Sequence, residues 1–458
     1  MKSNDLSRRR SALLMLNKLP MFYSRIQVYL ENTSWIMAEK FLNMSISFLV
    51  MILVARYLGP EQFGIFAYGI SLVALFAIAG HVGLSGLVVR ELVKHPQTKE
   101  EIMGTSFALK GLGYLVGLIL LLLFAFLTEA NNSPEFWIVI ILAISLLFQP
   151  FDVIDYWFQS RLEAKYTAIS RTIGLLASSV IKVLLVVASA DLIVFGLAHI
   201  VQSLIAAILL LLFYRYKSNL SVKDWRVSLS RARELFSQGW VVFLGSIFAV
   251  IYLRVDQVML KWLVGTEAVG VYAVAATLSE AWYFVPVAIV GSFFPKLLEL
   301  KNSNPNLYRK RLQQIFDLLF IIALVVAVIV TLLAQPIISI VFGVSYIYSS
   351  DILVVHIWAA LFIFMRAAFS KWILIENVLI FSLITQGMGA VANVLFNLWL
   401  IPKYGGIGAA YATLFSYSMA SYLALIFYGK TRPVFWMMSL SIVSPLRYVP
   451  VIFRKSSL

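Results

Sequence analysis

One phrase occurs twice in this chain, first as Leu58-Gly59-Pro60-Glu61-Gln62-Phe63-Gly64-Ile65-Phe66-Ala67 and again, 206 positions later, as Val264-Gly265-Thr266-Glu267-Ala268-Val269-Gly270-Val271-Tyr272-Ala273. Each copy stands in a short polar gap between two long apolar stretches. A fainter echo pairs Gly196-Leu197-Ala198-His199 with Gly408-Ala409-Ala410-Tyr411. We expect each phrase to form a tight turn and the start of a helix, with its glutamate in the first turn, where an anion suits the helix dipole. A membrane protein built from two like halves has a natural cavity at their seam, which is typical of transporters.

The composition places the chain in a membrane. Its mean hydropathy is +0.90, 61% of its 458 residues are hydrophobic and 13% are charged, whereas a soluble domain carries about 25% charged residues. The absence of cysteine excludes disulfides, zinc–thiolate sites and thiol catalysis. The four histidines are scattered without the spacing of metal ligands. We therefore expect no metal, no cofactor and no catalytic residues.

Twelve apolar stretches are long enough to cross a bilayer, which takes about 20 residues in a helix. We predict an all-α membrane protein with twelve transmembrane helices in two six-helix lobes related by a pseudo-twofold axis along the membrane normal. The predicted divisions are an N-terminal tail (1–33), an N-lobe (34–214), a basic cytoplasmic linker (215–236), a C-lobe (237–428) and a C-terminal tail (429–458). Both tails are expected to be cytoplasmic or to lie at the membrane interface. The predicted spans are 34–56, 63–89, 103–127, 136–158, 167–188, 192–214, 237–260, 268–294, 314–334, 352–371, 378–400 and 405–428.

The distribution of lysine and arginine predicts the orientation. With a cytoplasmic amino terminus, the inner segments hold 28 of the 37 basic residues and the outer loops hold three, Arg56, Lys261 and Lys403. This is the inside-positive pattern of an inner-membrane protein with both ends in the cytoplasm. The net charge of +15 is therefore explained by topology, aided by anionic membrane lipids, and nucleic acid is not an expected partner.

Four motifs, taken together and in this order, resemble the O-antigen and polysaccharide flippases of the multidrug/oligosaccharidyl-lipid/polysaccharide exporter superfamily. They are Ala55-Arg56-Tyr57-Leu58-Gly59-Pro60-Glu61-Gln62-Phe63-Gly64, Phe151-Asp152-Val153-Ile154-Asp155-Tyr156-Trp157-Phe158-Gln159-Ser160-Arg161, Arg254-Val255-Asp256-Gln257-Val258 leading into Gly265-Thr266-Glu267, and Phe342-Gly343-Val344-Ser345-Tyr346.

The resemblance covers nearly the whole chain, and it implies a transporter of the bacterial inner membrane and not an enzyme. The implied activity moves an undecaprenyl-diphosphate-linked oligosaccharide from the inner to the outer leaflet, for O-antigen-like surface polysaccharide. A polysaccharide polymerase and a chain-length regulator are the protein partners that it implies. No fixed motif carries individual binding residues over from the family.

Charged residues inside the spans are the candidate site, because they are costly in hydrocarbon and usually face a cavity or a partner. Arg171 and Lys182 are the clearest pair, since eleven residues on a helix return to nearly the same face about 16 Å further along. Both can bind phosphate, although each could instead extend to its own membrane interface. The other cations expected to contact phosphate are Lys40, Lys110, Arg254 and Arg366.

Three acids and one histidine are candidates for ion coupling. Asp152 and Asp155 are neighbours on one helix face after Pro150, a plausible bend; simple pairing with Arg171 or Lys40 is the favoured alternative. Glu280 lies deep in a span six residues before Pro286, where a salt bridge to Arg254 or Arg366 would explain it equally well. His81 lies in a glycine-rich run more typical of close helix packing than of a proton relay. Because Arg254 and Asp256 are about 200° apart on a helix, we expect only one of them to face the cavity.

Two other functions remain open. A cation-coupled exporter of small drugs would need an apolar pocket lined with acids, and six cations within the spans count against it. A membrane glycan polymerase or ligase would need chemistry on the outer face, where the loops are short and nearly free of arginine. Transport of a lipid-linked oligosaccharide by alternating access of the two lobes is the function that the sequence favours.

Overall fold

The computed structural model describes residues 2–447, and it describes side chains for 31–378 and 380–447. Within these residues the regular structure is entirely helical. The α-helices are α1 (Lys2–Ala77), α2 (Ser85–Lys94), α3 (Lys99–Thr128), α4 (Pro134–Ala143), α5 (Val153–Ser160), α6 (Ala164–Val187), α7 (Leu192–Ser218), α8 (Leu229–Leu263), α9 (Thr266–Glu280), α10 (Phe284–Ser303), α11 (Pro305–Val341), α12 (Ser349–His356), α13 (Ala360–Glu376), α14 (Leu379–Ser421) and α15 (Arg432–Ile442).

These helices supply the twelve predicted spans. Nine helical stretches of the described chain are long and apolar enough to cross a bilayer, and a tenth is a pair bent by 40° at residue 148. Two of the nine, Glu31–Lys94 and Ile380–Phe427, hold 64 and 48 residues, far more than the roughly 20 that one crossing needs. Each is interrupted by a glycine with non-helical backbone angles, Gly59 or Gly405, and therefore provides two crossings. The twelve-helix fold class is confirmed.

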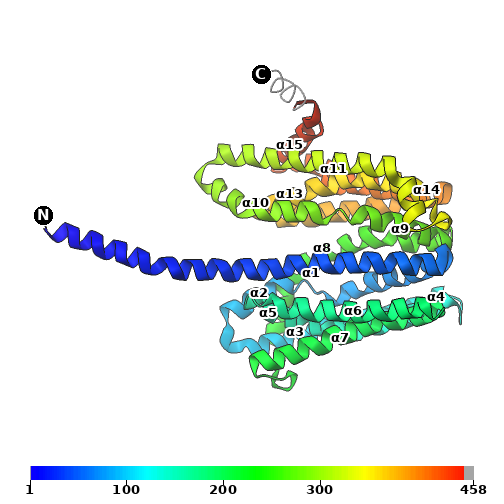
Figure 1. Cartoon of the computed structure of the whole chain (residues 1–458), viewed down its shortest axis with the longest axis horizontal. Helices are drawn as coiled ribbons and strands as arrows, with labels where there is room; N and C mark the ends of the chain where they lie inside the picture. The colour runs from blue at the N-terminus through cyan, green and yellow to red at the C-terminus, as the bar shows by residue number, and fades with distance from the viewer. Residues whose placement is uncertain (1, 448–458) are drawn as a thin grey trace.

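The helices form two lobes on either side of a seam. Figure 1 shows α2–α7 packed on one side of α1 and α9–α14 on the other, with α8 close beside α1. We call α1–α7 the N-lobe and α8–α14 the C-lobe. We call the end of the bundle that carries Gly59 the distal end, and the end from which the amino-terminal part of α1 projects the proximal end. The residue limits predicted for the lobes and tails stay predictions.

The repeated phrase forms the turn that was expected of it. Gly59 has φ 73° and Gly265 has φ 130°, in a region of backbone space that favours glycine. The helix α9 begins immediately afterwards, with Glu267 in its first turn. Both copies therefore reverse the chain at the distal end and start the next membrane crossing.

The second glycine of each phrase, Gly64 or Gly270, allows a close helix contact that the sequence did not predict. A Cβ atom on Gly64 would lie 1.8 Å from the carbonyl oxygen of Thr266, and one on Gly270 would lie 1.9 Å from the carbonyl oxygen of Pro60. The two copies thus pack directly against each other, and the absence of side chains lets the two helix backbones touch. Among the glycines of the chain, these two make the closest approach to another backbone, and the contact lies in the seam between the lobes.

Further contacts close the distal end around that crossing. The Tyr346 hydroxyl of the C-lobe donates a hydrogen bond of 2.8 Å to the carbonyl oxygen of Ala55 in the N-lobe. Lys261 of α8 pairs with Glu129, which follows α3, and the Tyr68 hydroxyl donates to the same carboxylate. The distal half also holds the largest buried apolar cluster, which draws on both lobes.

Two of the candidate acids, Asp152 and Glu280, lie next to breaks in the helices. At the predicted Pro150 bend, 3₁₀ turns connect α4 to α5, and Asp152 is the last residue of the second of these turns. The break between α9 and α10 follows Glu280 directly. Because a break frees backbone groups and changes the direction of the chain, both acids lie where a helix can bend.

The tails add little to the membrane core. The helix α15 has 11 residues, too few to cross a bilayer, and Arg447 beyond it binds Asp317 of α11 at 2.7 Å. A resting place on the membrane surface stays a prediction for this tail, and residues 448–458 lie outside the described chain. The side chains of residues 1–30, which make up most of the predicted N-terminal tail, lie outside it too.

Candidate functional site

The main cavity lies between the lobes. It has a volume of about 600 Å³ and is walled by α1, α6 and α7 of the N-lobe and by α8 and α9 of the C-lobe. Its surface is largely apolar, with methionine and phenylalanine from α1, and its polar groups come from several helices. We call it the central cavity; its polar and charged side chains are Ser45, Ser47, Ser71, Ser179, Lys182, His199, Gln202, Arg254, Gln257, Thr277 and Glu280.

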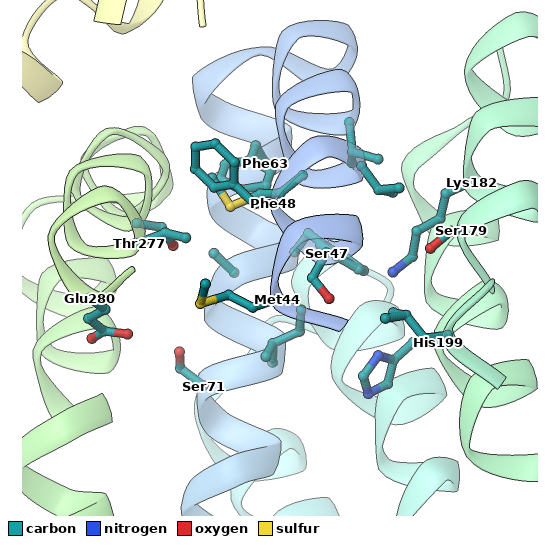
Figure 2. A pocket seen from close by; sticks show the side chains of 18 of the residues that line it. Met44, Ser47, Phe48, Phe63, Ser71, Ser179, Lys182, His199, Thr277 and Glu280 are labelled. Atoms are coloured by element: carbon teal, nitrogen blue, oxygen red, sulfur yellow. The ribbon is translucent and has the colours of Figure 1, made fainter. Parts of the chain in front are cut away.

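Lys182 is the most prominent charge in the central cavity. Figure 2 shows its ammonium group pointing inward beside Ser179 and above His199, which comes from α7. The ammonium lies 5.8 Å from the centroid of the Phe66 ring, and no carboxylate of the described residues is within 4.0 Å of it. Since a charge without a partner is expensive inside a membrane, Lys182 is suited to an anionic ligand.

Arg254 and Glu280 line the C-lobe side of the same cavity. Glu280 lies on the wall opposite Lys182 (Figure 2). Arg254 and Glu280 face the same cavity, yet no described residue forms an ion pair within 4.0 Å with either of them. A contact salt bridge, the alternative considered for Glu280, is therefore not formed in this conformation.

Arg171 lies in an adjoining cavity of about 410 Å³ in the N-lobe. Its guanidinium binds Asp155 at 3.1 Å and Asp152 at 3.6 Å, so the two acids are neutralised in the way the pairing alternative described. The two cavities share four lining residues, Met44, Ser47, Leu175 and Gln202. The structure therefore places Arg171 and Lys182 beside two adjoining cavities along α6, and a coupling role for the acids stays a prediction.

Three predicted residues lie away from these two cavities. Lys110 is buried inside the N-lobe, where it donates to the Tyr156 hydroxyl at 3.2 Å and lies 4.9 Å from the centre of that ring. Lys40 is exposed on α1. His81 is exposed at the end of a 3₁₀ turn, 6.4 Å from the ring of Tyr114. None of the three lines the central or the adjoining cavity, and their proposed roles stay predictions.

Arg366 lies in a third cavity, of about 340 Å³, whose lining residues all come from the C-lobe. It donates to the carbonyl oxygen of Ala420 at 2.8 Å and to the Thr385 hydroxyl at 3.3 Å. The structure therefore separates Arg366 from the other cations that the sequence grouped with it.

The sequence analysis did not identify the neutral polar residues that line the central cavity. Ser71 donates a hydrogen bond of 2.7 Å to Gln257 and thereby ties the two lobes together. His199 and Gln202 are three residues apart on α7, so both face the cavity. Polar residues at helical spacing within an apolar span were the signal that could have identified them.

Only one of Arg254 and Asp256 faces the central cavity, as their spacing on the helix predicted. Arg254 faces the cavity, and Asp256 points away from it into the C-lobe. There its carboxylate accepts hydrogen bonds from Tyr272 (2.9 Å), Thr413 (2.6 Å) and Asn397 (2.6 Å).

Solved structures show the same fold. A lipid II flippase, MurJ, in an inward closed conformation matches with a TM-score of 0.69 at 15% identity, covering 92% of this chain and 93% of that one. An inward-facing multidrug resistance MATE family transporter of the MOP superfamily matches with a TM-score of 0.64 at 14% identity, covering 86% and 95%.

Curated relatives are more similar in sequence. The "Uncharacterized membrane protein MJ1068" of Methanocaldococcus jannaschii is 25% identical over 438 residues, which is 87% of this chain and 84% of the relative. The "Probable flippase AglR" of Haloferax volcanii is 26% identical over 387 residues, or 82% and 78%. The "Putative O-antigen transporter" of Shigella flexneri is 24% identical over 307 residues, or 64% and 72%.

A family model described as polysaccharide biosynthesis protein matches residues 29–301, more than half of the chain. This match includes three of the four motifs on which the family resemblance was based, and it covers the helices that surround the central cavity. The chain therefore belongs to the polysaccharide biosynthesis protein family, on a membrane fold that it shares with transporters of the MOP superfamily.

Proposed function

We propose that the chain moves a diphosphate-linked oligosaccharide on an undecaprenyl carrier across the inner membrane, from the cytoplasmic to the outer leaflet. The observation that carries this proposal is the pair of cations, Lys182 and Arg254, on facing lobes of one cavity with no ion-pair partner among the described side chains. A diphosphate supplies the negative charge that both lack, and arginine can bind phosphate through two hydrogen bonds. The family match and the names of the flippase and O-antigen transporter relatives support the same substrate class.

The cavities suggest a path for the head group. In the proposed orientation, with both termini in the cytoplasm, the proximal end faces the cytoplasm and the closed distal end faces outward. The diphosphate would enter beside Arg171, whose charge is already offset by two acids. It would then move along α6 to the unpaired Lys182, about 16 Å further. The sugars would occupy the seam, and the polyprenyl tail would remain in lipid between the lobes.

Charge removal tests the proposal. In a strain that lacks the gene, the variants Lys182→Gln and Arg254→Gln should each reduce surface glycan about tenfold or more, because a hydrogen bond to a charged group contributes about 1.5–3 kcal/mol. Lipid-linked intermediates should accumulate on the cytoplasmic leaflet. Lys403→Gln makes the same charge change at an exposed distal position and should leave display unchanged. Normal display in the Lys182→Gln, Arg254→Gln double variant would show that the diphosphate is not bound there.

One observation favours a second candidate, the export of a cationic small molecule. Glu280 provides an unpaired acid on the C-lobe wall, and the α1 wall of the same cavity is rich in phenylalanine and methionine side chains. In inverted vesicles, a cationic dye exporter would lose activity in Glu280→Gln and retain it in Lys182→Gln. If the chain is instead a flippase for a diphosphate-linked oligosaccharide, Lys182→Gln should impair its transport.

A further inference from the structure

The cavity around Arg366 is separate from the path proposed above. It is walled by α8, α10, α13 and α14 and has a volume of about 340 Å³, at the small end of the range for ligand pockets. Tyr252 lines it from α8, two residues before Arg254, which lines the central cavity. Because two residues on a helix are about 200° apart, the two cavities lie on opposite sides of α8.

Arg366 is the cation of this cavity and has no acidic partner. Both of its hydrogen bonds are made by one terminal nitrogen, and both acceptors are neutral, the Ala420 carbonyl and the Thr385 hydroxyl. No carboxylate of the described residues comes within 4.0 Å of the guanidinium, which carries five N–H donors in all. The remaining donors and the charge suit an anion that fits the planar group, such as a carboxylate.

A second group in the same cavity also lacks a partner. The Tyr283 hydroxyl is buried and has no described hydrogen-bond partner within 3.5 Å, although Ser279, four residues earlier, lies close enough to interact with it. Tyr283 stands at the break between α9 and α10, and the residue lines the cavity. Buried polar atoms are almost always bonded, so an unpartnered hydroxyl on a residue that lines the same cavity as an unpaired cation favours a ligand that would complete both.

Two further tyrosines lie in the wall among aliphatic and small polar residues. Tyr252 and Tyr417 lie edge to face, with ring centres 5.3 Å apart, and Gln386 and Ser382 add amide and hydroxyl groups. An inorganic anion would leave these rings without contact. A pyranose ring would use them, since its apolar face packs on aromatic side chains while its hydroxyls reach the few polar groups.

We infer that the C-lobe cavity binds an acidic sugar, with the sugar carboxylate on Arg366, the ring against the tyrosines and a hydroxyl on Tyr283. The inference rests on the proposed function, because the acidic sugar would belong to the transported oligosaccharide. It adds a substrate class: a repeat unit that contains a uronic acid or a similar carboxylated residue.

Binding to the purified full-length protein tests the site. Methyl β-glucuronide should bind saturably by isothermal titration calorimetry, whereas methyl β-glucoside, which has the same ring without the carboxylate, should bind at least tenfold more weakly. Arg366→Gln should weaken glucuronide binding by a similar factor. Lys371→Gln removes a charge from the same helix outside the cavity and should bind as the natural protein does.

A milder variant distinguishes a loss of binding from a loss of the fold. Tyr283→Phe removes one hydroxyl that forms no hydrogen bond within the described structure, so the fold should be unaffected while glucuronide affinity falls several-fold. Equal binding of glucoside and glucuronide would overturn the inference. So would glucuronide binding that is unchanged in both variants, or inorganic phosphate that binds at Arg366 as tightly as the glucuronide.

The two proposals can fail separately. If glucuronide does not bind but Lys182→Gln still stops the display of glycan, the acidic-sugar site is wrong and the flippase proposal stands. If glucuronide binds through Arg366 but Lys182→Gln and Arg254→Gln leave the display of glycan unchanged, the proposed diphosphate path through the central cavity is wrong.

Discussion

Asp256 shows what a single buried acid contributes to this protein. Its carboxylate accepts three hydrogen bonds from neutral donors on α9 and α14, and it is 3% exposed. Asp256→Ala would take this acceptor from Tyr272, Thr413 and Asn397. The last two keep a second acceptor, the Ala409 carbonyl and Asn393, and a buried donor that is left unsatisfied costs about 1–3 kcal/mol. We therefore expect a clearly lower thermal midpoint of the purified protein, measured by differential scanning fluorimetry.

Two matched variants calibrate this result. Asp256→Asn keeps the shape and one acceptor oxygen, so its loss of stability should be smaller. Asp351→Ala removes an exposed acid at the distal end and should leave the midpoint in place. An Asp256→Ala midpoint equal to that of the natural protein would mean that the network does not stabilise the C-lobe.

The candidate site was predictable at this scale only in part. Charges within spans were a sound starting set, and Lys182, Arg254 and Glu280 do line one cavity. The depth of a residue follows from its place in an apolar stretch, but its direction depends on partners far away in the chain. Lys110 illustrates this, since its hydrogen-bond partner, Tyr156, is 46 residues away. No spacing rule within one helix could have assigned that contact.

At the scale of elements, the crossing of the two repeated phrases should be intolerant of any side chain. Gly64→Ala would place a Cβ 1.8 Å from the Thr266 carbonyl oxygen, so the helices α1 and α9 must separate. Overpacking of this kind typically costs about 1–3 kcal/mol. We expect Gly64→Ala and Gly270→Ala each to lower the thermal midpoint and to impair the display of surface glycan.

Gly111 provides the matched control. It lies within the apolar helix α3, and an added Cβ there would meet nothing within 4 Å. Gly111→Ala should therefore be neutral or slightly stabilising, because alanine is the better helix former. If Gly64→Ala were as well tolerated as Gly111→Ala, the helices would not be held at the close approach seen here.

The sequence predicted the turn and the helix start of each phrase correctly. It could not predict that the phrases touch each other, because a glycine needed for close approach looks the same in sequence as one needed for a turn. The glycine of the turn is Gly59 in one copy and Gly265 in the other, whereas Gly64 and Gly270 make the contact. Duplication was thus visible in the sequence, and the symmetric contact that it produces was visible only in the structure.

At the scale of the whole molecule, span number and the two-lobe arrangement followed from hydropathy and repetition. Hydropathy and repetition did not predict where the spans are interrupted or how the tails are folded. The predicted span 63–89 ends as a regular helix at Ala77, and a 3₁₀ turn and a short connection lead to α2. Glycines at 80, 83 and 86 occur in this region, and Gly83 packs against the backbone of Gly239 in the C-lobe. The chain leaves the helix at Val82 and Gly83, which both have positive φ, and the second of these is also the point of contact with the other lobe.

The distal contacts imply that transport requires the lobes to part there. Phe124 of the N-lobe and Trp262 of the C-lobe stack with ring centres 5.3 Å apart and an angle of 23°. The chain has no cysteine, so the double variant Phe124→Cys, Trp262→Cys introduces the only thiols. A short bifunctional methanethiosulfonate should cross-link this pair and stop translocation of lipid-linked oligosaccharide in proteoliposomes, and reduction should restore it, because alternating access moves the lobes relative to each other.

A pair within one lobe supplies the control with almost identical geometry. Phe381 and Tyr428, both on the C-lobe side, stack at 5.2 Å and 23°. Cross-linking of Phe381→Cys, Tyr428→Cys should proceed equally well and leave transport intact, since these positions move together if the lobes are rigid bodies. Transport that survives complete cross-linking of the Phe124–Trp262 pair would mean that the substrate leaves without separation of the distal ends. The lobes would then have to release it sideways into the membrane, while the crossing of Gly64 and Gly270 stays closed throughout.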